Sequence, residues 1–146
     1  MPALLRHARV TYGISMRAAL AAAGYDDIPG NGLYVIGGLA IEAGAVPLTE
    51  LIRHLRVSKQ AAGQLVDTLV VRGYLERAPD AHDRRRLTVT LTERGRAAAK
   101  VQRAARSEID VALLARVGPA AVRQTRATLA ALIDMRPSPA SADGDD

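Results

Sequence analysis

The fold of this chain is decided by residues 83–95, which run Asp83-Arg84-Arg85-Arg86-Leu87-Thr88-Val89-Thr90-Leu91-Thr92-Glu93-Arg94-Gly95. The stretch opens with an acid and three arginines. An alternating strand follows, with Leu87, Val89 and Leu91 facing one way and Arg86, Thr88 and Thr90 the other. Thr92 can cap a new helix, because its hydroxyl can accept a free backbone N–H of the first turn. A basic hairpin tip held on a short ribbon suits insertion between the phosphate walls of a nucleic acid.

Two short helices are predicted directly upstream of this ribbon. Thr49 is the expected N-cap of the first, and Ser58 is the expected N-cap of the second, which Gly73 closes. Two strands follow, over residues 74–78 and 86–91, with a turn between them. We therefore predict a mainly α fold with a small two-stranded β wing, which is a winged helix-turn-helix.

Further helices are predicted on both sides of this region, which spans about residues 45–92. They run over residues 3–23, 31–43, 93–116 and 119–135. Asn31 is the expected N-cap of the second helix, and Gly118-Pro119 separates the last two, since proline is favoured at the first position of a helix. Residues 1–136 are expected to form a single domain of six helices, and residues 137–146, made of Pro, Ser, Ala, Gly and Asp, a mobile tail.

Composition limits what the chain can be. At 146 residues it is long enough for a real core, which must be built from Ala, Leu, Val and Ile because Phe and Trp are absent and only four Tyr occur. Cysteine is absent, which excludes disulfides, thiolate catalysis and thiol redox sensing. No apolar run reaches about 18 residues, so no membrane partner is expected and the cytoplasm is the expected compartment.

Positive charge is concentrated in the predicted wing region. Residues 48–100 hold eleven Lys or Arg and six Asp or Glu, whereas the last ten residues hold three Asp and no base. The formal net charge of the whole chain is +5. Such a basic excess fits a polyanionic partner, although charge balance alone fits a solvated basic face equally well.

The second helix of the pair fits a recognition helix. Its first turn holds Ser58, Lys59 and Gln60, with Gln64 one turn later, and the N-terminal residues of such a helix reach base edges in the major groove. Gln can pair with adenine, and Lys can donate to guanine or to phosphate. Because paired helices are common in helical proteins, this pattern leaves a purely structural role open.

The wing favours DNA more strongly. Arg84, Arg85 and Arg86 lie at the predicted tip, and an arginine side chain fits the narrow, electronegative minor groove. Asp83 is interpreted as a local clamp that accepts hydrogen bonds from turn amides or orients an arginine. The alternative for the arginines is an exposed charge run, which their place directly after a helix, a glycine and a strand disfavours.

These elements together resemble the MarR family of bacterial transcription regulators. The resemblance covers about residues 45–100, and the flanking helices agree with it in number and length. The matching residues are Leu51 through Arg72, Gly73-Tyr74-Leu75-Glu76-Arg77, Asp83-Arg84-Arg85 and Val89-Thr90-Leu91-Thr92-Glu93-Arg94-Gly95. In that family the wing arginine two places after the aspartate enters the minor groove, which implies Arg85 here, with Asp83 as its structural partner.

The resemblance also implies a homodimer. The outer helices form the interface in the family, which here means residues 3–23, 93–116 and 119–135, although their Ala- and Leu-rich faces also suit a monomer core. A two-fold dimer presents two recognition helices about one DNA turn apart. Double-stranded DNA with a palindromic operator is therefore the expected partner, and a repressor the expected role.

A small-molecule effector is expected on the resemblance alone. Many family members release DNA when an aromatic ligand enters a cleft between the dimer helices and the DNA-binding lobe. This chain lacks the aromatic lining typical of such clefts. Tyr12, Met16 and Tyr34 are its only candidates, and core packing is the alternative role of each, so the ligand-binding residues stay unknown.

Enzyme functions are not expected. His7, His54 and His82 lie on three predicted elements, and none pairs with another at metal-ligand spacing. No paired carboxylates and no Gly-rich phosphate loop mark a catalytic site, and Asp26-Asp27 is interpreted as a solvated loop. We therefore expect no catalytic residues, no metal ligands and no cofactors. The remaining alternatives are a winged helix that binds proteins and a DNA-binding protein that needs no ligand.

Overall fold

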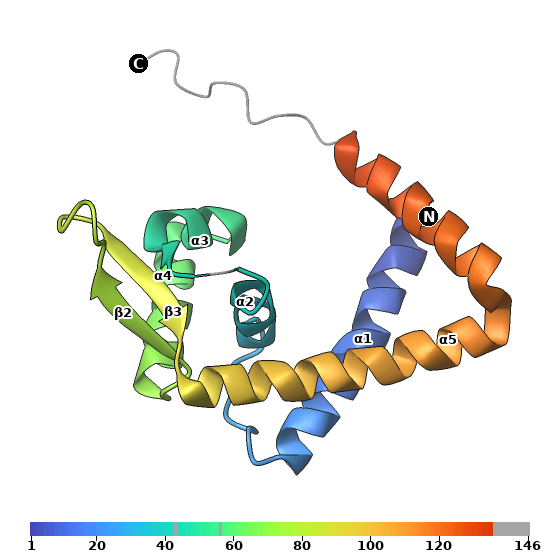
Figure 1. Cartoon of the computed structure of the whole chain (residues 1–146), viewed down its shortest axis with the longest axis horizontal. Helices are drawn as coiled ribbons and strands as arrows, with labels where there is room; N and C mark the ends of the chain where they lie inside the picture. Colours follow the sequence, from blue (N-terminus) through green and yellow to red (C-terminus); the bar gives the residue numbers. More distant parts are fainter. Residues whose placement is uncertain (43, 56, 136–146) are drawn as a thin grey trace. The chain divides into compact units, whose positions relative to one another are not determined.

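The computed structural model describes residues 1–42, 44–55 and 57–135, so the expected mobile tail lies outside the described residues. The elements are α1 (Pro2–Ala22), α2 (Gly32–Leu39), β1 (Val46–Pro47), α3 (Leu48–Leu55), α4 (Lys59–Val71), β2 (Leu75–Pro79), β3 (Leu87–Leu91) and α5 (Glu93–Asp134) (Figure 1). The predicted mainly helical fold with a small wing is confirmed. The chain divides into two units, residues 1–107 and, in the described part, residues 108–135.

The sheet differs from the prediction, because it has three antiparallel strands in the order β1-β3-β2 and not two. The extra strand is β1, in which Val46 pairs with Val89 and Pro47 with Thr88. Two residues are too few to show an alternating pattern, so this strand has no signal of its own in the sequence. The wing itself is the β2–β3 hairpin, whose register runs from Leu75 opposite Leu91 to Pro79 opposite Leu87.

The helix starts agree only in part with the predicted caps. Ser58 caps α4 as expected, since its Oγ accepts the N–H of Ala61 at 3.2 Å. Asn31 precedes α2 but makes no capping hydrogen bond with its side chain, because its own dihedrals are helical and not those of a capping residue. The expected cap Thr49 lies inside α3, which begins directly after β1 ends at Pro47. Helix α2 ends at Leu39, earlier than predicted.

The core of the first unit joins α1, α2, α3, α4, the sheet and the start of α5. It is aliphatic, as the composition predicts, except for one fully buried aromatic side chain, Tyr74. Thr88 is expected on the outer face of the ribbon but is buried, and it lies between Pro47 of β1 and Ala78 of β2. Its hydroxyl donates to the carbonyl of Ala78 at 3.1 Å, which satisfies the buried group.

The junction between the wing and α5 explains the end of the motif in residues 83–95. Thr92 caps α5 as predicted, with Oγ1 accepting the N–H of Gly95 at 3.0 Å and donating to the carbonyl of Gly73 at 2.5 Å. A Cβ atom at Gly95 would collide with the backbone carbonyl of Tyr74. Only glycine therefore allows the first turn of α5 to pack against the chain that leaves α4.

Asp27 makes specific contacts with the core, so the interpretation of Asp26-Asp27 as a solvated loop is wrong for Asp27. The carboxylate of Asp27 accepts hydrogen bonds from the hydroxyl of Tyr74 and from the guanidinium of Arg94, the latter at 3.2 Å. Arg94 also donates to the Tyr74 hydroxyl at 3.0 Å, and Arg72 donates to the backbone carbonyl of Asp27. The Tyr74 bond and the Arg94 charge lower the pKa of Asp27 below its usual value. These contacts connect the loop before α2 to the segment between α4 and β2 and to the start of α5.

The predicted break in the last helix is confirmed. Gly118 has φ 80° and ψ 164°, so α5 consists of two helices that meet at a kink before Pro119. Within the second unit, Arg126 forms an ion pair with Asp110 at 3.9 Å. Among the described residues, no helix is both long enough and apolar enough to cross a membrane.

Candidate nucleic-acid interface

The N-terminal half of α4 presents an exposed polar face. Ser58, Lys59, Gln60 and Gln64 are all exposed, whereas the opposite face of the helix is buried in the core. The apolar spacing of α4 causes this, because buried positions recur every three to four residues and leave the other side to solvent. The four side chains proposed from the sequence for base contact are therefore free to reach a groove.

The wing is tied to this helix by an ion pair between Arg77 of β2 and Asp67 of α4. Thr90 of β3 also donates to Glu76 of β2 at 3.1 Å, which adds a side-chain bond across the hairpin. Helix α4 and the ribbon are thus joined by one side-chain ion pair as well as by the core.

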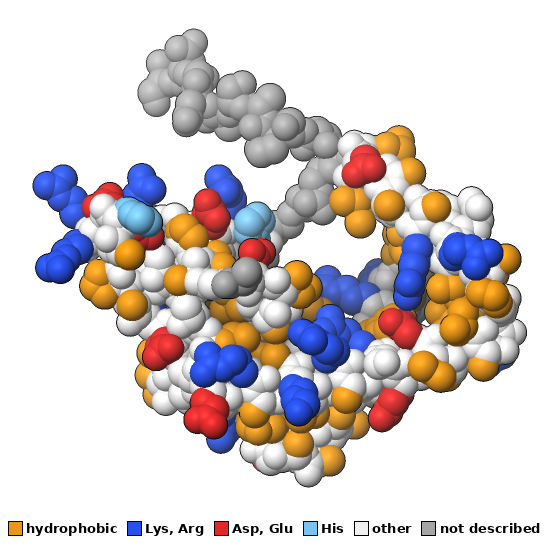
Figure 2. Space-filling view, viewed as in Figure 1, with side chains coloured by type: hydrophobic (Ala, Val, Ile, Leu, Met, Phe, Trp, Pro, Cys, Tyr) orange, Lys and Arg blue, Asp and Glu red, His pale blue; other side chains and the backbone are white. Residues whose placement is uncertain are grey.

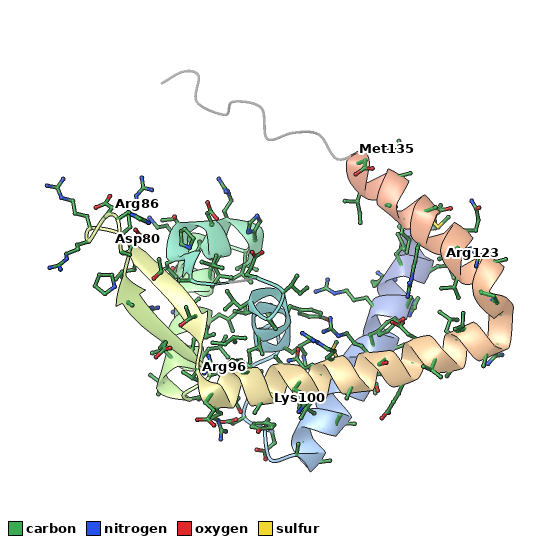
Figure 3. The ribbon with its side chains drawn as sticks, in the orientation of Figure 1. Asp80, Arg86, Arg96, Lys100, Arg123 and Met135 are labelled. Carbon is green, nitrogen blue, oxygen red and sulfur yellow. The ribbon has the colours of Figure 1, made fainter. Side chains whose placement is uncertain are left out.

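The wing tip is organised by Asp83. Its Oδ1 accepts the backbone N–H of Arg85 at 3.1 Å, and its Oδ2 lies 3.4 Å from Nε of Arg86. All three arginines, Arg84, Arg85 and Arg86, are exposed, and Figure 3 shows Arg86 at the tip of the hairpin. Asp83 thus holds the backbone of Arg85 and the side chain of Arg86, as a local clamp would.

Asp80 is a second carboxylate in the tip, and sequence reasoning missed it. Its Oδ1 accepts the N–H of His82 at 2.7 Å and the N–H of Asp83 at 3.0 Å, and these bonds lower the pKa of the Asp80 carboxyl. The backbone N–H of Asp80 donates to the carbonyl of Arg86 at 2.9 Å. The sequence does hold a signal for this role, because Asp80 precedes His82 by two residues and Asp83 by three. An Asp that accepts backbone N–H groups at this spacing forms an Asx turn.

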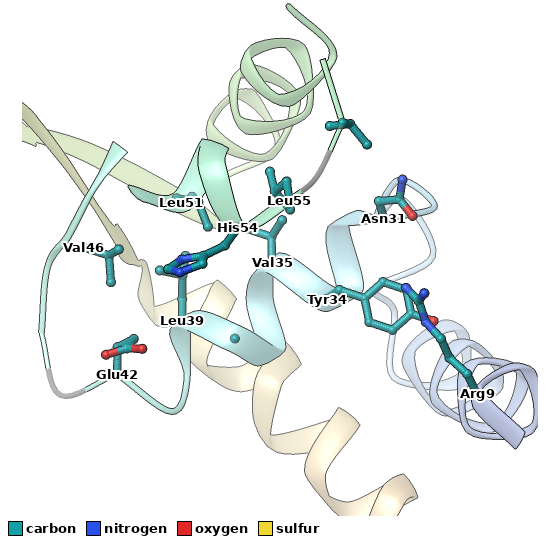
Figure 4. A pocket seen from close by; sticks show the side chains of 12 residues that line it. Arg9, Asn31, Tyr34, Val35, Leu39, Glu42, Val46, Leu51, His54 and Leu55 are labelled. Atoms are coloured by element: carbon teal, nitrogen blue, oxygen red, sulfur yellow. The ribbon is translucent and has the colours of Figure 1, made fainter. Parts of the chain in front are cut away.

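Two cavities of the first unit meet at Tyr34. The larger, of about 730 Å³, lies among α1, α2 and α3 and is lined by Arg9, Glu42 and His54 among others (Figure 4). The smaller, of about 270 Å³, is lined from α1, α2 and α5, and it brings together all three residues that the sequence offered as effector candidates, Tyr12, Met16 and Tyr34. The guanidinium of Arg9 lies 4.2 Å from the centre of the Tyr34 ring.

One polar group in the smaller cavity is not satisfied. Gln102 of α5 is only 1% exposed, and its Nε2 has no hydrogen-bond partner among the described residues. A buried donor of this kind destabilises the fold unless something accepts from it. In the described part of the chain, no group of three or more His, Asp or Glu is placed to hold a metal ion.

Together, the helix pair, the ribbon and the exposed tip define a winged helix-turn-helix protein. Residues 26–86, which include the helix pair and the arginines of the wing tip, match the model of the MarR family. The resemblance to the MarR family that the sequence predicts is therefore confirmed over these residues. No curated protein matches the chain as a relative.

Solved structures share the whole fold at low sequence identity. FabT of Streptococcus pneumoniae in complex with DNA has a TM-score of 0.76 and 17% identity, covering 91% of this chain and 92% of that chain. The MepR–DNA complex of S. aureus has a TM-score of 0.74 and 18% identity, covering 93% and 98%. Wild-type MarR of E. coli in its apo form has a TM-score of 0.68 and 21% identity, covering 90% and 96%.

Proposed function

We propose that this protein is a repressor that binds a palindromic operator in double-stranded DNA as a homodimer. The observation that carries the proposal is the wing tip, in which exposed arginines are held by Asp83 next to an exposed recognition helix. Two similar structures, FabT and MepR, were solved in complex with DNA, which supports the same partner here.

In this proposal the two parts of the interface have different tasks. Arg84, Arg85 and Arg86 contact phosphates and the minor groove, so they supply affinity that falls as the salt concentration rises. Ser58, Lys59, Gln60 and Gln64 contact the major groove and supply the choice of sequence. Asp83 supports the wing without touching DNA.

The experiment is a titration of the purified protein against a labelled duplex from its own upstream intergenic region, with a scrambled duplex alongside and at two salt concentrations. We expect tight, salt-sensitive binding that prefers the native duplex. Arg85→Ala should weaken operator binding by about 1–3 kcal/mol. Unchanged binding by this variant would remove the wing from the proposal.

Gln64→Ala is the matched variant for base contact. It should change the preference between duplexes more than it changes the affinity for scrambled DNA, because a glutamine amide contacts base edges and carries no charge. An equal loss on all duplexes would argue against sequence readout by α4. If the unmodified protein binds no duplex even at low salt, the alternative of a winged helix that binds proteins takes first place.

We further propose the smaller cavity as an effector site that controls release from DNA. It holds Tyr12, Met16 and Tyr34 together, and the unsatisfied Nε2 of Gln102 supplies a donor for a ligand oxygen. A thermal-shift screen with small aromatic acids tests this site. A hit that Gln102→Leu abolishes supports it, whereas the absence of any hit would favour a DNA-binding protein that needs no ligand.

A further inference from the structure

A third cavity carries a strong positive charge that neither the wing nor the effector site uses. It has a volume of about 570 Å³ and lies where the end of α2, the end of β3 and the start of α5 meet. It shares no lining residue with the cavity proposed for the effector. Its cationic residues are Arg96, Lys100 and Arg103.

The three cations form one stripe along α5. Their spacing of four and then three residues places them on the same face of a helix. Figure 2 shows Lys and Arg side chains over the part of α5 that follows β3, and Figure 3 labels Arg96 and Lys100 on this part. Like charges at this spacing destabilise a helix, so the stripe lowers the stability of α5 unless an anion compensates it.

Compensation from within the chain is small. Among the described residues, Arg96, Lys100 and Arg103 form no ion pair. Arg96 donates one N–H to the carbonyl of Leu91 at 2.7 Å, which fixes its guanidinium beside the cavity. Glu42 is the one carboxylate among the lining residues, so the described lining carries a net positive charge.

The floor of the cavity is apolar. Leu39, Leu91 and Ala99 line it and are themselves largely buried in the core. A solvated basic face on a helix has no such floor. A cavity of this size, with an apolar base and a few polar groups that fix orientation, is typical of small-molecule sites.

We propose that this cavity binds a small organic anion, with a phosphate or carboxylate group held by Arg96, Lys100 and Arg103 and a compact apolar body against Leu39 and Leu91. Guanidinium and ammonium groups bind both kinds of anion through charge-assisted hydrogen bonds. The site is separated from the wing tip by the length of β3, whose five residues span about 17 Å at 3.3 Å per residue. It is therefore distinct from the surface proposed for DNA.

Three probes separate the two halves of the site, and all are titrated into the full chain without DNA by calorimetry. Phenyl phosphate carries both features, inorganic phosphate only the anion, and benzyl alcohol only the ring. We expect phenyl phosphate to bind about tenfold more tightly than inorganic phosphate, since burial of a ring adds to the charge contacts. Equal affinity for these two probes would overturn the apolar half of the assignment, and no binding of phenyl phosphate would overturn the site.

The variant K100Q/R103Q should weaken phenyl phosphate at least about tenfold, because it removes two charged donors. The matched control is R116Q/R123Q, which removes the same charge from exposed positions of α5 outside the cavity and should leave the affinity unchanged. Equal losses in both variants would mean a general charge effect and would overturn the site. Because no DNA is present, failure of the proposed repressor function would not change either result.

Discussion

The wing tip shows how two acids can serve a surface that is proposed to bind a polyanion. Asp80 accepts the N–H of Asp83, and Asp83 accepts the N–H of Arg85. The two bonds follow each other along the turn and end at the arginine that is expected in the minor groove. Each carboxylate is placed to accept turn amides, which is the usual way in which Asp stabilises a tight turn. The negative charges of the two acids weaken the attraction to DNA. Their hydrogen bonds, in turn, order the backbone that carries the arginines.

These hydrogen bonds predict that one substitution lowers the affinity for DNA although it removes a negative charge. Asp80→Ala removes a negative charge near the proposed DNA surface, so charge alone would raise the affinity for DNA. If Asp80 orders the tip, the affinity should instead fall by about three- to tenfold, because two backbone bonds are lost. Duplex titration measures this, and Asp80→Asn, which keeps an acceptor oxygen, should recover most of the loss. A rise in affinity in both variants would refute the positioning role.

Gly95 gives a test of stability at the same scale. Gly95→Ala should lower the free energy of unfolding by about 1–3 kcal/mol, since its methyl group meets the carbonyl of Tyr74. The matched control is Gly63→Ala in α4, where a Cβ meets nothing within 4 Å and the change should stabilise the helix by up to about 1 kcal/mol. Urea denaturation compares the two. Equal effects would show that the close contact at Gly95 is not the cause.

Residues whose role is local could be predicted from the sequence, and residues whose partners are distant could not. Ser58 and Thr92 were predicted as caps, because a capping bond reaches only two or three residues along the chain. The contacts of Asp27 could not be predicted, because its partners Tyr74 and Arg94 lie 47 and 67 residues away. No local pattern contains that information.

At the scale of elements, the same rule explains the sheet. The β2–β3 hairpin follows from alternation and turn residues, whereas β1 is defined only by its pairing with β3. The residues on α4 that are proposed for base contact follow from helical spacing and a cap. The cationic cavity does not, because it appears only when the ends of α2 and β3 meet α5.

The contacts of Tyr74 join the loop before α2 to the start of α5, and they predict a pH dependence. Burial and the bond to Asp27 raise the pKa of Tyr74 to about 12, compared with about 10 in an unfolded chain. A group whose pKa is raised by folding stabilises the fold fully below the unfolded pKa and loses this contribution as the pH rises through the folded pKa. Tyr74 should therefore stabilise the protein up to about pH 10 and no longer above about pH 12.

Tyr74→Phe should lower the free energy of unfolding at neutral pH by about 1–2 kcal/mol, since Asp27 loses a donor. The difference from the unmodified protein should shrink between pH 10 and pH 12. Chemical denaturation across this range measures both effects. Tyr25→Phe keeps the ring that meets Tyr74 edge-on and should leave the pH dependence unchanged. A Tyr74→Phe deficit that stays constant to pH 12 would mean that the hydroxyl does not titrate as expected.

At the scale of the whole molecule, the outer helices expose many large apolar side chains. In the first unit, α1 exposes Leu4, Val10 and Ile14. In the second unit, the exposed large apolar side chains are Val111, Leu113, Leu114, Val117, Leu132, Ile133 and Met135. Apolar side chains in such number on the described helices favour burial against a second copy, as the family resemblance implies.

The proposed homodimer can therefore be tested at one of these positions. Leu132→Glu should shift the mass in solution from two chains towards one, because it would place a charge in an apolar interface. Operator affinity should fall in parallel, since a monomer presents one recognition helix where the palindrome needs two. The control is Val71→Glu, at a side chain of α4 that is 86% exposed, and its mass should not change. Light scattering with size exclusion gives the mass, and a Leu132→Glu protein that keeps the mass of two chains would place the interface elsewhere.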